Sequence, residues 1–173
     1  MSWLNARGGL LNQYASGNAN AAAAEGHFDQ VAAAAPSSAL GGAVADMFRS
    51  HETPAFPQLA GQLFNNANGV QKASVLNTLL EGAGPALASI LGSAGLGSLA
   101  ADASRGEGVT PEAAQQVPPQ VVQQMAEHAE QHDPTIVDRL GSIYSQHPGL
   151  IKTLGGAALA VTLAKLAQRQ QGQ

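Results

Sequence analysis

The chain has 173 residues, a formal net charge of −4 and no cysteine. That length allows one domain with a sizeable core, while the missing cysteine excludes disulfide scaffolds and thiolate metal sites. The few Lys and Arg residues are scattered and form no basic patch, so we expect no nucleic-acid partner.

The composition favours helices over strands. Hydrophobic residues make up 45% of the chain, with Ala the commonest of them, and aromatic residues only 4%. Such residues suit closely approaching helices, whereas strands prefer β-branched and aromatic side chains. Charged residues reach only 12%, about half the usual share, and a weakly charged surface favours association with the same chain or another protein.

Residues 1–24 are predicted to form an amphipathic segment followed by a linker. Over residues 2–14 the apolar side chains, among them Trp3, Leu10 and Leu11, recur at helical spacing. We expect this helix to dock on the core. The alternative is an anchor for a partner or a membrane surface, because interfacial helices use Trp in this way, but the polar face has no lysine to bind anionic lipid.

The region 25–104 is rich in Ala and Gly, and Pro and Gly divide it into helices. Thr53 has the chemistry of an N-cap with Pro54 at the first helical position, and Asn68-Gly69 is typical of a helix end. We therefore expect helices from about residue 27 to Pro36, from Ser37 or Ser38 to Phe48, from Pro54 to Asn68, over residues 70–84, and after Pro85.

The region 105–173 is predicted to form a second helical part packed on the first, the two joined near residues 104–110. A short helix follows Thr110, and a longer one covers residues 119–131. Two later helices begin with the same signal, because "DPTIVDRLG" at 133 aligns with "HPGLIKTLG" at 147. We interpret this as two helices that bury the same face, the second of them running to about residue 168.

His128 and His132 are the candidate metal ligands. On a helix both lie on one face, so both imidazoles can reach one ion. However, the zinc-protease pattern needs Glu where Ala129 stands, and the di-iron pattern needs Glu three residues before each His. The favoured interpretation is structural, with His132 offsetting the dipole at a helix C-terminus. The alternative is a transition-metal or haem site completed by His27, His51 or His147.

The last helix carries small residues at a spacing of four: Gly156, Ala160 and Ala164. Such a ridge lets two helix backbones approach closely, either within one chain or between two copies. If residues 150–166 form a helix, apolar residues occur on nearly every side of it, which predicts a helix that is covered on most sides.

The middle of the chain resembles the YidB-like family of small bacterial helical proteins. The similarity lies in "FDQVAAAAPSSALGGAVADMF", "LFNNANGVQKASVLNTLL" and "GPALASILGSAG", within residues 28–98. It implies a helical fold with no established activity and no functional residues to carry over, and the part from "TPEAAQQ" onward departs from it.

The sequence therefore predicts an all-α protein, a compact bundle of seven to nine short helices without a sheet. We expect a non-enzymatic interaction or assembly protein that associates with itself and binds no cofactor. The alternatives are metal or haem binding through His128 and His132, and membrane association through residues 2–14. No secretory signal or membrane-spanning segment is visible, so a cytoplasmic location is expected.

Overall fold

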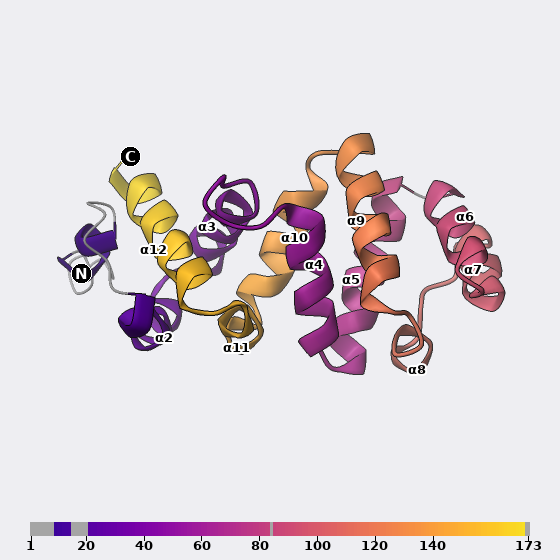
Figure 1. Ribbon diagram of the computed structural model, residues 1–173, viewed down its shortest axis with the longest axis horizontal. Helices are drawn as coiled ribbons and strands as arrows, with labels where there is room; N and C mark the ends of the chain where they lie inside the picture. Colours follow the sequence, from indigo (N-terminus) through magenta and orange to yellow (C-terminus); the bar gives the residue numbers. More distant parts are fainter. Residues whose placement is uncertain (1–8, 15–20, 84, 172–173) are drawn as a thin grey trace. The chain divides into compact units, whose positions relative to one another are not determined.

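The protein is all-α in the computed structural model, which describes residues 9–14, 21–83 and 85–171 (Figure 1). Within these ranges there is no strand. Residues 9–14 are helical, and the elements that follow in chain order are η1 (Ala21–Ala23), α2 (Ala24–Ala34), α3 (Ser37–Phe48), α4 (Phe56–Asn66), α5 (Gly69–Ala83), α6 (Pro85–Ser93), α7 (Gly97–Ser104), α8 (Pro111–Ala114), α9 (Pro119–His132), α10 (Ile136–Ser145), α11 (Pro148–Ile151), η2 (Lys152–Leu154) and α12 (Gly156–Gln171).

The all-α prediction is confirmed, but the described residues contain more helices than the seven to nine expected. Part of the difference comes from α8 and α11, which have four residues each. Both begin with Pro at the first helical position, which starts a helix readily but does not prolong it. Thr110 caps α8 as expected, since its hydroxyl accepts a hydrogen bond from the Ala113 backbone N–H at 3.2 Å.

The chain forms two units, as judged from its contacts, but the boundaries between them do not lie at residues 104–110. Unit 1 combines residues 1–55 with 141–173, and unit 2 is the continuous stretch 56–140. The expected linker is instead held inside unit 2, because the Asn77 side chain bonds the backbone of Val109 in both directions. The Val109 N–H donates to Asn77 Oδ1 at 2.7 Å, and Asn77 Nδ2 donates to the Val109 carbonyl at 3.4 Å.

In unit 1, α12 packs on α3 and α2 (Figure 1). The core contains Phe28, Met47 and Leu163, which are all fully buried. Two ion pairs also lie in this unit: Arg169 of α12 pairs with Asp46 of α3, and Lys152 of η2 pairs with Asp29 of α2. Each pair connects residues 123 positions apart, so the C-terminal part of the unit is held against its N-terminal part.

Residues 141–145 of α10 also belong to unit 1, where they cross α3 at very short range. A Cβ built on Gly141 would lie 2.6 Å from the carbonyl oxygen of Gly41 and 3.2 Å from the backbone nitrogen of Ala45. Only glycine fits at such a crossing. Next to it, Phe48 meets Tyr144 edge-on, with ring centroids 5.9 Å apart.

In unit 2, α9 packs on α4, α5 and α6, while α7 packs on α6 and α8 on α5 (Figure 1). The amphipathic patterns explain this arrangement, since Leu59, Leu63 and Phe64 of α4 are buried together with Val122 and Met125 of α9. The predicted helix over 119–131 is thus confirmed within one residue at its C-terminal end.

The final segment differs from the expected single helix between residues 148 and 168. Gly155 adopts φ 95° and ψ 169°, a backbone region that is open almost only to glycine, and it separates η2 from α12. The apolar residues of 150–166 therefore lie on two separate elements. Leu150 and Ile151 are buried from α11, and Leu159, Leu163 and Leu166 from α12.

Candidate functional site

The small-residue ridge lies along α12, and two of its three members belong to the side that faces away from α2 and α3. Gly156, Ala160 and Ala164 are each half-buried. The buried side, which faces α2 and α3, consists of Ala158, Leu159, Thr162, Leu163, Leu166 and Ala167. The opposite side, which we call the outer face of α12, is formed by Ala157, Ala160, Val161 and Ala164; Ala157 is exposed and the other three are half-buried.

The N-terminal helical residues 9–14 belong to unit 1 and bury two side chains. Leu11 and Tyr14 are 2% and 3% exposed, and the Tyr14 hydroxyl lies 2.6 Å from Nδ1 of His27. Burial also raises the pKa of the Tyr14 hydroxyl. Leu11, a candidate anchor for a partner or membrane, is therefore a core residue here. Leu10 is half-buried, and Trp3 lies outside the described residues.

The histidine pair lies in the last turn and a half of α9, in unit 2. His128 is half-buried and His132 is exposed at the helix C-terminus, as the structural interpretation expects. In the described parts of the chain, no three His, Asp or Glu side chains come together as a metal site would require. His27, His51 and His147, the possible additional ligands, belong to unit 1.

Asp133 follows the histidine pair and starts the next helical segment. Its Oδ1 accepts hydrogen bonds from the Thr135 hydroxyl at 2.6 Å and from the Thr135 backbone N–H at 3.1 Å. These bonds, in that order, and the nearby charges of Arg139 and His132 lower the pKa of Asp133. The Asp133 carboxylate therefore stabilises the turn between α9 and α10, which begins at Ile136.

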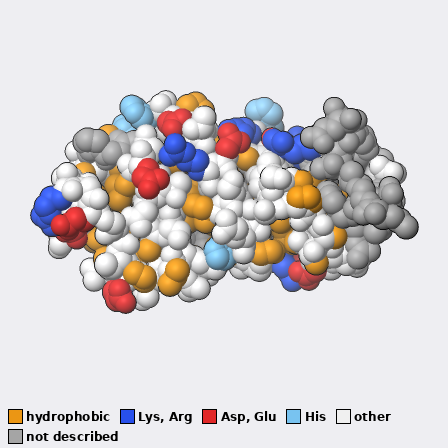
Figure 2. All heavy atoms as spheres, turned by 180° about the vertical axis from the view of Figure 1, so that it is seen from behind, with side chains coloured by type: hydrophobic (Ala, Val, Ile, Leu, Met, Phe, Trp, Pro, Cys, Tyr) orange, Lys and Arg blue, Asp and Glu red, His pale blue; other side chains and the backbone are white. Residues whose placement is uncertain are grey.

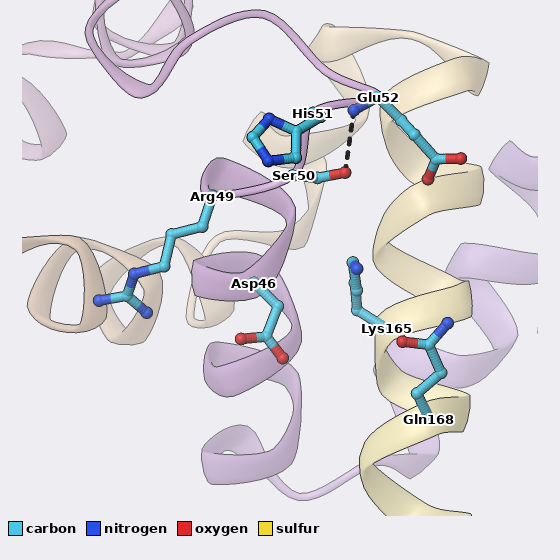
Figure 3. Close-up of a pocket in the computed structure, with 7 residues that line it drawn as sticks. All are labelled: Asp46, Arg49, Ser50, His51, Glu52, Lys165 and Gln168. Atoms are coloured by element: carbon cyan, nitrogen blue, oxygen red, sulfur yellow. Dashed lines mark hydrogen bonds between the residues drawn. The ribbon is translucent and has the colours of Figure 1, made fainter.

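A pocket in unit 1 was not predicted from the sequence. Its volume is about 400 Å³, and it lies between the end of α3 with the following loop and the last turns of α12 (Figure 3). The residues that line it are Asp46, Arg49, Ser50, His51, Glu52, Lys165 and Gln168.

The loop in this pocket is fixed by two short-range contacts. Ser50 Oγ accepts a hydrogen bond from the Glu52 backbone N–H at 3.1 Å, drawn as a dashed line in Figure 3. Thr53, expected to begin the next helix, instead donates its hydroxyl to the Met47 carbonyl at 2.7 Å and so closes the end of α3. The helix expected at Pro54 begins at Phe56.

One further buried polar group of unit 1 lies on α10. The Tyr144 hydroxyl is fully buried without a hydrogen-bond partner among the described residues, and burial raises its pKa. Leaving such a group unsatisfied costs about 1–3 kcal/mol. The Tyr144 ring packs edge-on against Phe48 in a position where its hydroxyl forms no hydrogen bond to a described residue.

Large hydrophobic side chains are scarce on the surface of the described residues. Val70, which is 66% exposed, is the one large hydrophobic residue that stands out there. On the face drawn in Figure 2, apolar side chains form small separate areas and charged ones are scattered. Among the described helices, none is both long and apolar enough to cross a membrane.

Comparison of the chain with family models, curated proteins and solved structures finds no match. The resemblance to the YidB-like family therefore stays a prediction.

Proposed function

We propose that this chain is a non-enzymatic helical interaction protein that associates with a second copy of itself through the outer face of α12. The observation that carries the proposal is the division of α12 into two sides. One side buries large apolar residues against α2 and α3, and the other presents Ala157, Ala160, Val161 and Ala164, without a charge among them.

The small size of these residues supports a contact between two helices. Alanine and glycine allow two helix backbones to approach closely, so many atoms come into van der Waals contact without a large exposed side chain. A two-fold symmetric pair needs only one face, because each copy presents the same surface to the other. The low content of charged residues, 12%, weakens the repulsion that keeps two copies apart.

Light scattering coupled to gel filtration, at high micromolar concentration, tests this proposal. We expect a dimer or larger species for the unmodified chain. Ala160→Leu should dissociate it while the far-UV spectrum stays helical, because the larger side chain separates the two helices. Ala33→Leu is the matched control, since Ala33 is an exposed residue of α2 in the same unit.

A monomer for the unmodified chain would overturn the proposal, and so would an Ala160→Leu variant that assembles as the unmodified chain does. A variant that loses about 1–3 kcal/mol of stability instead would show that Ala160 packs within its own chain.

A further inference from the structure

The pocket between α3 and α12 contains a lysine that forms no ion pair with any described residue. Lys165 is half-buried, and its ammonium group projects into the space below Ser50 and Glu52 (Figure 3). Within the described residues no carboxylate oxygen lies within 4.0 Å of its Nζ, although two carboxylates line the same pocket. A partly buried charge is stabilised when an opposite charge pairs with it, so this position favours an anion.

The lining carboxylate on α3, that of Asp46, is already paired with another cation. Asp46 forms a two-pronged pair with Arg169, with Nε–Oδ2 and Nη2–Oδ1 distances of 2.6 Å and 3.1 Å. This geometry satisfies both oxygens and cancels the charge of Asp46. Gly42 makes room for the pair, because a Cβ there would lie 2.8 Å from the Arg169 guanidinium carbon.

The rest of the lining supplies hydrogen-bond donors. Ser50 Oγ accepts from the Glu52 N–H, which leaves its own O–H proton able to donate. Gln168 adds a side-chain amide, and His51 a ring nitrogen on the loop. Glu52 is exposed and is the one lining carboxylate with no ion pair to a described residue.

We propose that this pocket binds a small oxyanionic group, a phosphate or a carboxylate, with Lys165 as its counterion and Ser50 and Gln168 as donors. The volume of about 400 Å³ admits a group of this kind together with part of the molecule that carries it. This inference is independent of self-association, because it depends on Lys165 and the loop rather than on the outer face of α12.

The test is a titration of the full chain with inorganic phosphate, monitored by the NMR signals of the backbone amides. The ionic strength is kept constant, and chloride is the reference anion. Saturable shifts at the amides of Ser50, His51 and Glu52 are expected. Lys165→Gln should weaken the affinity about tenfold, because it removes one charge-assisted hydrogen bond. Glu52→Gln should strengthen it, because it removes a negative charge from the rim. A parallel titration with acetate separates a carboxylate ligand from a phosphate.

Lys152→Gln is the matched control, since Lys152 lies in the same unit but is paired with Asp29 at 2.8 Å. Its affinity should equal that of the unmodified chain. The proposal fails if neither anion gives saturable shifts, or if Lys165→Gln and Lys152→Gln bind alike.

Discussion

Residues 133–141 and 147–155 begin with nearly the same sequence pattern and end in different structures. Both have Pro at the second position, apolar residues at the fourth, fifth and eighth, and Gly at the ninth. In the first, α10 continues through Gly141 to Ser145. In the second, the helical turns end at Leu154, and Gly155 turns the chain with a positive φ before α12 begins.

The difference teaches that the two glycines serve different physical needs. Gly141 is required because it has no side chain, since the backbone of α3 lies where a Cβ would be. Gly155 is required for its backbone freedom, since nothing lies within 4 Å of a Cβ built there but its dihedral angles are barely accessible to other residues. Substitutions can separate the two needs.

The largest effect is expected from Gly141→Ala. Helix propensity alone predicts that this change stabilises α10 by about 1 kcal/mol. The contact at 2.6 Å with a backbone oxygen predicts the opposite, because α3 and α10 must move apart. We expect a net loss of about 3 kcal/mol in the free energy of unfolding, measured by urea denaturation.

Gly26→Ala is the control for this prediction. Gly26 lies within α2, and a Cβ there meets nothing within 4 Å. Gly26→Ala should therefore raise the free energy of unfolding by the full helix-propensity difference. Equal stabilisation by both substitutions would refute the close crossing.

Gly155→Ala should have the second-largest effect. The cost is conformational, about 2 kcal/mol, because alanine must adopt φ 95° and ψ 169° or α12 must be reoriented. Gly149→Ala in α11 is the matched control, because a Cβ there also meets nothing within 4 Å and its φ is not positive. If the two variants have the same urea midpoint, the positive φ is not needed.

The smallest effect on stability is expected from a substitution at the start of the first of the two segments, Asp133→Ala. Asp133 accepts two hydrogen bonds from Thr135, whereas His147, at the same place in the second segment, makes no side-chain cap. Asp133→Ala should therefore lower the melting temperature at neutral pH, by less than either glycine variant does.

The effect of Asp133→Ala should depend on pH. The pKa of Asp133 is lowered from 3.8 in the folded chain, so its contribution is present above pH 3.8 and is lost as the pH falls through the folded pKa. Melting curves of both chains at neutral and strongly acidic pH measure this change. A difference in melting temperature that persists at acidic pH would show that the carboxylate is not responsible.

Most helices could be predicted because their signals are local. Thr110 with Pro111, the polar end of α9 and the apolar stripes of α4 and α9 all act within a few residues of chain. The break at Gly155 was missed because the pattern at 147–155 matches that at 133–141, and the feature that distinguishes Gly141 is a distant segment, α3.

The pocket could not be predicted for the same reason. Lys165 and Ser50 are far apart in the sequence, and neither has a neighbouring motif that indicates binding. The burial of Leu11 likewise depends on a contact that periodicity does not specify, since an amphipathic helix has the same pattern whether it docks on its own core or on a partner.

The discontinuous make-up of unit 1 has a consequence for synthesis on the ribosome. Asp29 and Asp46 emerge 123 residues before Lys152 and Arg169, an interval of roughly 6–25 s at ordinary rates of translation. During that time α2 and α3 have no α12 to cover Phe28 and Met47, whereas unit 2, a continuous stretch, emerges whole. The nascent chain therefore presents an exposed apolar surface to chaperones until α12 has emerged.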